Sequence, residues 1–299
     1  MFKGLTGLIA GSLFGVGLTL SATVSAAEND DLNFFVLVKS SNYAQDVEGK
    51  LKLLNFHFFS ELFPKEGGSI TSAKLTRVSD GRNLPYVDRG NTYYYEGGHF
   101  GSVAEVDAEH ANGPYRFDIV TPSAQVKGAT LSLAGPNGKT DIPAPVTIYF
   151  EQGGAAIRPD AVDPMLPLRV SWSPYSNGRA DPKHIVDDMI FVVFQDCFGN
   201  RVFHTGLPFK EENYLTYRTT EVTVPVGTLV SGQDYAMFVE MPHVADSIKI
   251  GDVPGFTSFA TATYLDLKTS GKNSGKACPA VLPPLDTGQT DRMEKEAAH

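Results

Sequence analysis

Cysteine, tryptophan and basic residues are all scarce in this chain of 299 residues. The two cysteines, Cys197 and Cys278, lie far apart in the sequence, which excludes the C-x-x-C spacing of a redox-active pair. The 25 Lys and Arg residues are outnumbered by 34 Asp and Glu residues, which gives a net charge of −9. Nucleic acids and anionic membranes attract basic surfaces, so we expect neither to be a partner.

The short motifs of several large enzyme classes are also missing. The chain contains no G-x-S-x-G, no S-x-x-K with its companion motifs and no H-E-x-x-H, and it lacks the P-loop and G-x-G-x-x-G. These absences disfavour the corresponding hydrolases and nucleotide-binding enzymes. Paired catalytic carboxylates of glycosidases can be far apart in sequence and leave no motif. A carbohydrate-active enzyme is therefore kept as an alternative.

A long apolar run occurs at the N-terminus. Lys3 precedes the sixteen-residue run Leu5–Leu20, which contains four glycines, and the small residues Val24-Ser25-Ala26 follow. This pattern predicts a cleaved signal peptide over residues 1–26, and cleavage after Ala27 fits equally well. The alternative is a retained membrane anchor, but the run is shorter than the roughly 20 residues that a spanning helix needs. We therefore expect an exported chain, periplasmic or extracellular, with no membrane span after cleavage.

Export changes the interpretation of the two cysteines. An even pair in an exported protein usually forms a disulfide, so we expect Cys197 and Cys278 to be bonded. The bond would close a loop of about 80 residues, for which the chain-entropy model gives roughly 4 kcal/mol.

The residues that are abundant favour strands joined by tight turns. The chain has 29 Gly, 19 Pro, 12 Tyr and 19 Phe. Short apolar or alternating runs predict strands in residues 28–138, and Gly135–Lys139 has the composition of a domain boundary. The predicted strands are Phe34–Val38, Leu51–Phe59, Ile70–Val78, Tyr115–Ile119 and Ala129–Leu133.

One short helix is expected within this N-terminal domain. Ser102 and Glu105 have the spacing of a capping box, in which the serine hydroxyl accepts from a free backbone N–H and the glutamate reaches back. Val103, Val106 and His110 then fall on one helical face. The pattern predicts a helix over Val103–Ala111, ended by Asn112-Gly113-Pro114.

Residues 139–275 alternate more strictly. Leu168–Ser173 places Trp172 on the inward side, and a second alternating run extends from Tyr235 to Met241. Leu229, Gly232 and Tyr235 match the L-x-x-G-x-x-Y pattern that leads into the sixth strand of fibronectin type III domains, and Trp172 matches their inward tryptophan. The segment therefore resembles a fibronectin type III domain, and the resemblance implies an immunoglobulin-like sandwich.

The expected fold is accordingly all-β, with two immunoglobulin-like β-sandwich domains. The first spans residues 28–138 and includes the short helix. The second, the fibronectin type III-like domain, spans residues 139–275. Residues 276–299, which end in a charged stretch, are expected to form a disordered tail.

A cluster rich in aromatic and polar residues is the main candidate site. Tyr93, Tyr94, Tyr95, Glu96 and His99 lie together, with Gly97-Gly98 among them. Successive strand residues face opposite sides, so three neighbouring tyrosines cannot all be buried, and an exposed tyrosine ring offers a flat face to sugar or peptide. The alternative is that Tyr94 packs inward, its neighbours face solvent and the glycines form a turn.

Metal sites are disfavoured, and we expect no metal and no cofactor. Glu96-x-x-His99 has a spacing that brings ligands together on a helix, and the glycines argue against one. Asp107 and His110 fit a helix, where a surface charge pair is the more common outcome. The acidic loop Asp181–Asp188 has too few oxygens for calcium, which needs six to eight.

The function expected from these features is non-enzymatic. A fold-level analogy favours binding, adhesion or structural support in a bacterial periplasm or at the cell surface. The expected partner is a glycan, a cell-surface polymer or another exported protein. The alternatives are a hydrolytic enzyme with its site in the N-terminal domain, and a pilus-type chaperone, whose basic anchor and apolar edge strand we do not identify.

Overall fold

The computed structural model describes residues 29–210, 214–273, 275 and 277–279. Strands account for most of this part, which contains one α-helix, α1 (Val103–Glu109). The all-β prediction is therefore confirmed. The predicted signal peptide lies outside the described residues, and so does the predicted tail apart from residues 277–279.

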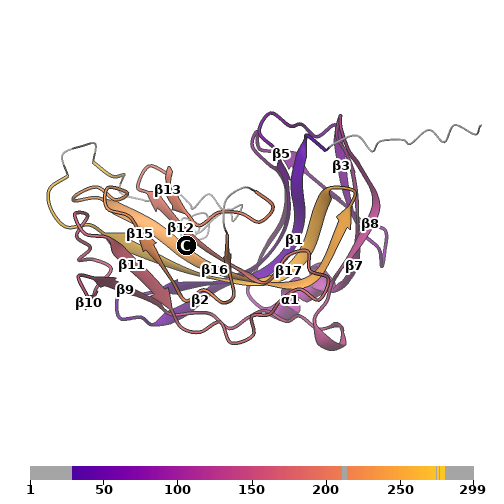
Figure 1. The fold of residues 1–299 in the computed structure, drawn as a ribbon. Coiled ribbons are helices and arrows are strands. Elements are labelled where there is room, and N and C mark those ends of the chain that lie inside the picture. Colours follow the sequence, from indigo (N-terminus) through magenta and orange to yellow (C-terminus); the bar gives the residue numbers. More distant parts are fainter. Residues whose placement is uncertain (1–28, 211–213, 274, 276, 280–299) are drawn as a thin grey trace, which may run out of the picture.

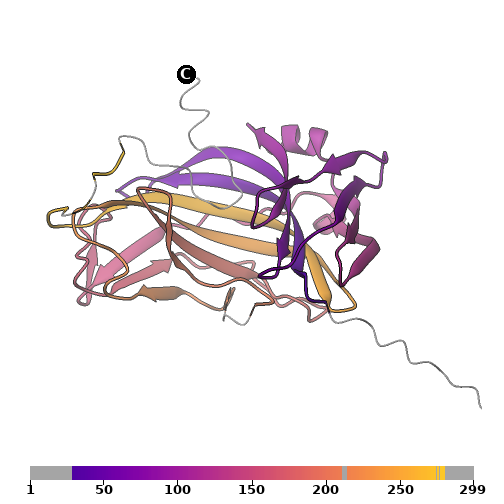
Figure 2. The same ribbon diagram turned by 90° about the horizontal axis from the view of Figure 1, so that it is seen from above.

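One large sheet runs through the whole molecule (Figures 1 and 2). Its strand order is β13-β12-β16-β17-β1-β2-β6-β5, and β14 pairs with β12 outside this path. The strands of this central sheet are β1 (Leu32–Gln45), β2 (Leu51–Pro64), β5 (Val87–Asp88), β6 (Tyr93–Phe100), β12 (Met189–Asp196), β13 (Arg201–His204), β14 (Leu215–Thr216), β16 (Asp234–Ile250) and β17 (Val253–Lys268).

Two smaller sheets of four strands each complete the fold. One has the order β4 (Asn83–Pro85), β3 (Ser72–Arg77), β7 (Gly113–Val120) and β8 (Gln125–Leu133). The other has the order β10 (Ala155–Ile157), β9 (Ile148–Gln152), β11 (Leu168–Trp172) and β15 (Glu221–Val224). Figure 1 shows them near opposite ends of the central sheet.

Side-chain alternation shows that both small sheets cover the same face of the central sheet. In β17, Phe259 belongs to the core under β3, β7 and β8, whereas Leu265 and Leu267 belong to the core under β9, β11 and β15. These three residues are an even number of positions apart and therefore share a face. The other face carries a different set of buried residues, among them Phe256 and Ala260.

The predicted division into two separate sandwiches is not confirmed, because the two segments share a sheet. β1 pairs in parallel with β17, from Phe35 opposite Gly255 to Ala44 opposite Tyr264. The Gln45 side chain also exchanges two hydrogen bonds with the backbone of Ile148, at 2.7 and 2.8 Å. The two small sheets pack on separate cores, but strands from both predicted domains build the sheet on which these two cores rest.

The aromatic anchors predicted for the second half are buried in the second core. Trp172 on β11 is 5% exposed and Tyr235 on β16 is 1% exposed. The Tyr235 hydroxyl accepts a hydrogen bond of 2.8 Å from the backbone N–H of Val230. The resemblance to fibronectin type III domains stays a prediction.

The disulfide prediction is confirmed. Cys197 follows β12 and is bonded to Cys278, with a Cα–Cα distance of 5.4 Å. The bond attaches the end of the described chain to the central sheet. The Sγ atom of Cys197 also accepts a hydrogen bond from the buried amide of Gln233.

Candidate functional site

The face of the central sheet that the small sheets leave uncovered contains a hollow. We call it the concave face, because β1 and β17 bend upward on this side (Figure 1). The hollow comprises about 870 Å³, part of it open to solvent, and residues of β1, β2, β12, β13, β16 and β17 line it. Long strands rather than loops supply most of this lining, which holds the side chains in fixed positions.

Phenylalanines make the wall of the hollow apolar. Phe34 stacks on Phe63 with ring centroids 4.2 Å apart, and its ring lies 6.0 Å from that of Phe256. Phe191 and Phe238 line the hollow from β12 and β16. Rings at these separations form a continuous surface suited to an apolar molecule.

Glu240 places a carboxyl group in the hollow, whose lining also includes the charged residues Glu61 and Arg201. The residue is half-buried, and burial raises its pKa to about 7. No cation lies within ion-pairing distance of it in the part of the chain that the structure describes. A carboxyl group in apolar surroundings without a partner is costly when charged, and such groups are concentrated at functional sites.

His204 adds a neutral hydrogen-bonding group at the same hollow. Burial lowers its pKa to about 4, and the nearby Arg201 and Lys210 add to this effect. Its Nδ1 atom accepts a hydrogen bond of 2.9 Å from the backbone N–H of Gly206. This bond fixes the tautomer that carries its proton on Nε2, so the ring offers a donor there.

A polar cluster lies beside the hollow, where β2 pairs with β6. His57, Glu96 and His99 each present a ligand atom, and these atoms all lie within 4.8 Å of one another. His57 Nε2 and Glu96 Oε1 are 2.7 Å apart, and the two imidazoles stack with centroids 4.2 Å apart. Phe59, which lines the hollow, also stacks with His57, with ring centroids 4.9 Å apart.

The glycines in this segment form a bulge inside β6. His57 pairs with His99, and the next partners are Phe59 and Glu96, so β6 carries an extra residue. Gly97-Gly98 is therefore not the turn that our alternative interpretation assumed. The glycines do lie in a strand and not in a helix, and the bulge brings Glu96 and His99 to the concave face.

The five predicted site residues divide between the two faces of the sheet. Tyr94 is 1% exposed and belongs to the apolar cluster of the concave face, with the Arg89 guanidinium 3.8 Å from the centre of its ring. Tyr93 and Tyr95 are half-buried against the core under β3, β7 and β8. Only Tyr94, Glu96 and His99 thus share a face with the hollow.

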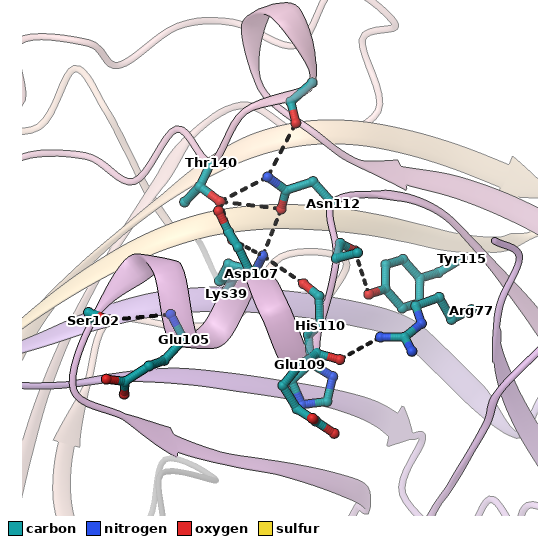
Figure 3. Close-up of polar contacts among 12 residues, drawn as sticks. Lys39, Arg77, Ser102, Glu105, Asp107, Glu109, His110, Asn112, Tyr115 and Thr140 are labelled. Carbon is teal, nitrogen blue, oxygen red and sulfur yellow. Dashed lines mark hydrogen bonds and ion pairs between the residues drawn. The ribbon is translucent and has the colours of Figure 1, made fainter. Parts of the chain in front are cut away.

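The serine half of the predicted capping box is present at α1, as Figure 3 shows, whereas the Glu105 side chain reaches Gly101, one residue before Ser102. The Ser102 hydroxyl accepts from the backbone N–H of Glu105 at 3.2 Å, and the Glu105 carboxylate accepts from that of Gly101 at 2.8 Å. The helix begins at Val103 as expected and ends at Glu109.

Asp107 and His110 do not form the surface pair expected of them (Figure 3). Asp107 accepts a hydrogen bond of 2.6 Å from Nζ of Lys39, a fully buried β1 residue. Lys39 also donates to the carbonyl of His110 and the side chain of Asn112, which uses its three donors. Burial lowers the pKa of Lys39, and this cluster attaches α1 to the central sheet.

The His110 ring instead packs inward. It stacks on Phe58 with centroids 3.9 Å apart, and Nε2 donates to the carbonyl of Gly97 at 2.9 Å. Burial lowers its pKa to about 4, so the ring is neutral near pH 7. This histidine supports the bulge of β6 from the core side.

The acidic loop before β12 also serves the fold. The Asp181 carboxylate accepts from the backbone N–H groups of Lys183, Ile185 and Val186 and from the hydroxyl of Ser247. These donors already occupy its oxygens. The hydrogen bonds of Asp181 therefore hold this loop in its conformation and attach it to β16 through Ser247.

Sequence reasoning missed His57 and Glu240. His57 was treated only as part of a predicted strand. Glu240 is the single formally charged residue between Tyr235 and Val244. A lone carboxyl in a mostly apolar stretch is the feature that could have identified it.

Comparison with known proteins adds no functional information. No protein-family model matches the chain, and no curated protein matches it. One solved structure that is similar over 78% of this chain is trypsin-activated alpha-2-macroglobulin from Escherichia coli, with 11% identity and a TM-score of 0.19. The chain spans 15% of that structure, and a TM-score this low supports no shared fold.

A search for membrane-spanning helices gives a negative result for the described residues. None of their helices combines the length and the apolar character that crossing a bilayer requires.

Proposed function

We propose that this protein is an exported, non-enzymatic binding protein that holds an amphiphile on its concave face. The apolar part of the ligand packs against the phenylalanines of the hollow, and an amine or hydroxyl group donates to Glu240. The observation that carries the proposal is the unpaired carboxyl group of Glu240 within an apolar lining.

The chemistry of the hollow narrows the class of ligand. A carboxylate accepts hydrogen bonds and attracts cations, so an amine supplies both a donor and the missing charge. A ligand carboxylate would instead place two like charges in a medium of low dielectric constant. We therefore expect a preference for amines, then alcohols, over carboxylates of equal chain length.

The disulfide supports the exported location, because such bonds persist in oxidising compartments. A binding role agrees with the function expected from the sequence, and the lining of the hollow indicates an amphiphile as the ligand.

The test compares three ligands that differ only at the head group: dodecylamine, dodecanol and dodecanoate. Calorimetric titration is carried out with the chain lacking residues 1–26, at pH 8 and below the critical micelle concentrations. We expect the amine to bind at least about 10-fold more tightly than the carboxylate, which corresponds to roughly 1.4 kcal/mol. Glu240→Gln should remove most of this difference, whereas Glu66→Gln, which changes an exposed glutamate, should retain it.

Two outcomes would contradict the proposal. The first is absence of binding by all three amphiphiles. The second is a head-group preference that Glu240→Gln leaves unchanged. A parallel panel of glycans, assayed for both binding and hydrolysis, tests the other expectations: glycan binding alone would favour the adhesion role, and turnover would favour the enzyme.

A further inference from the structure

We propose that His57, Glu96 and His99 bind a divalent transition-metal ion, with Zn²⁺ as the representative ion. The three residues come from two adjacent strands, and their ligand atoms lie within 4.8 Å of one another. Zinc bonds of about 2.0 to 2.1 Å in tetrahedral geometry separate donor atoms by roughly 3.3 Å. The distances between the ligand atoms in the structure lie on both sides of this value. His57 Nε2 and Glu96 Oε1 are 2.7 Å apart, and every other pair lies within 4.8 Å.

The backbone of β6 is shaped to bring these ligands together. In a regular strand, residues three apart face opposite sides of the sheet, so Glu96 and His99 would be separated. The bulge at Gly97-Gly98 changes this alternation and places both side chains beside His57. Bulges that redirect a side chain are frequent next to functional sites.

Both positions of the bulge require glycine. A Cβ atom at Gly97 would lie 2.5 Å from the ring of Phe58 and 2.6 Å from its carbonyl oxygen. Gly98 has a φ of +98°, which side chains rarely adopt. The sequence therefore tolerates two conformationally costly residues within a strand, and the result is the convergence of three metal-binding side chains.

The surroundings hold two of these side chains in position. The backbone N–H of Gly98 donates to Glu96 Oε1 at 2.9 Å, which orients the carboxylate. His57 is fully buried, and its ring stacks with those of Phe59 and His99. Hydrogen-bonded outer groups of this kind set the orientation of metal ligands.

His57 meets Glu96 through Nε2, at 2.7 Å, so this is the nitrogen that faces the proposed ion. Its Nδ1 atom is buried and has no hydrogen-bond partner in the described part of the chain. Burying an imidazole with only one nitrogen paired costs stability. The chain thus keeps a costly buried histidine at this position, and exceptions of this kind are expected at functional sites.

The donor set indicates the class of metal. Two imidazoles and one carboxylate suit Zn²⁺ and its neighbours in the first transition series, whereas Ca²⁺ and Mg²⁺ prefer oxygen ligands throughout. Three protein ligands leave a fourth position for water or for a donor atom of another molecule.

The experiment measures stoichiometry, affinity and ligand identity with Zn²⁺ and Co²⁺. The chain lacking residues 1–26, without an affinity tag, is stripped with a chelator and titrated in competition with a chromophoric chelator. We expect one equivalent of Zn²⁺ to bind. Co²⁺ should produce the visible d–d absorption of a site with four or five ligands.

Variants assign the site to these residues. His99→Ala and Glu96→Gln should each weaken Zn²⁺ binding by more than about 10-fold, since even outer-shell changes cost 10-fold to 100-fold. His57 is left unchanged because it is buried in the sheet. His184→Asn is the matched control: it removes an exposed histidine from another loop, and asparagine tolerates its φ of +56°. Circular dichroism verifies that each variant is folded.

Binding of less than one equivalent at micromolar Zn²⁺ by the unaltered chain would overturn the proposal. Equal affinity in all three variants would do the same, because the ion would then lie elsewhere. Neither result bears on the amphiphile, since Glu240 is not among the ligands. Conversely, a failed amphiphile titration leaves this metal test unaffected.

Discussion

Replacing Glu240 by glutamine should change how the stability of this protein depends on pH. The pKa of Glu240 is raised to about 7, from the ordinary value of 4.5, by burial in the hollow. Between these two values the folded chain holds a proton that the unfolded chain has released. The stabilising contribution of the group is therefore complete below pH 4.5 and is lost as the pH rises through 7.

The magnitude follows from the size of this shift. Each unit is equivalent to 1.36 kcal/mol, so the shift corresponds to about 3 kcal/mol. Because Glu240 is only half-buried, solvent screening reduces the expected contribution to roughly 2 kcal/mol. Glutamine has nearly the same shape and does not ionise. The free energy of unfolding of Glu240→Gln relative to the unaltered chain should thus rise by roughly 2 kcal/mol between pH 5 and pH 8.

Urea unfolding at intervals across this range provides the measurement. Comparison of the two chains is essential, because His110 and His204 titrate with the opposite sign. Their pKa values are lowered to about 4, so their contributions are lost as the pH falls from 6.5 through 4. These effects occur in both chains and largely cancel in the difference. A difference that stays constant within about 0.5 kcal/mol would refute the raised pKa and weaken the proposed role of Glu240.

Four further changes test the fold. Cys197→Ser should lower the free energy of unfolding, measured in urea, by about 2 to 4 kcal/mol, and reduction of the native disulfide should have the same effect. If neither treatment lowered the free energy of unfolding, the disulfide would not be stabilising. Trp172→Ala should cost about 3 to 5 kcal/mol, and a neutral result would show that the ring is not core. Tyr93→Ala with Tyr95→Ala should cost about 2 to 4 kcal/mol by the same assay, since both rings pack on a core. An unchanged melting temperature with loss of glycan binding would instead favour the ligand surface predicted from sequence. Lys39→Met should lower the free energy of unfolding by about 2 kcal/mol. This is less than the roughly 3 to 5 kcal/mol lost when a fully buried ion pair is broken, because the partner Asp107 is 33% exposed. A gain in stability would contradict this prediction.

Local features of the fold could be predicted from the sequence because short-range chemistry determines them. The cap at Ser102, the inward side of Trp172 and the burial of Tyr94 all follow from spacing and alternation. The disulfide followed from export and an even cysteine count. None of these requires knowledge of which strands are neighbours.

Strand partners could not be predicted in the same way. Alternation in Phe34–Val38 indicates two faces, yet it contains no information that β1 pairs with β17, more than 200 residues later. The polar residues Ser40 and Asn42 also concealed the full length of β1, which extends to Gln45. Their side chains are buried in the sheet. From composition alone, such polar residues indicate that a strand has ended.

The three-residue metal cluster could not be recognised from the sequence for a related reason. Gly97-Gly98 is compatible with a turn or with a bulge, because both use positive φ. The choice depends on β2, which pairs with β6 on both sides of the glycines. His57 joins Glu96 and His99 only through that pairing. Alternation, by contrast, did predict that Tyr94 faces away from Tyr93 and Tyr95.

The arrangement of the sheet explains why the hollow and the metal cluster share one face. The two small sheets cover the same side of the long strands, and within the described part of the chain neither of them extends over the apolar residues on the opposite side. Phe59 joins the two sites, since it lines the hollow and stacks on His57. Because β17 contributes side chains to both cores and to the hollow, a ligand bound there stabilises a strand on which the whole fold depends. Binding should therefore raise the unfolding temperature of the entire molecule in one transition, by mass action on the folded state.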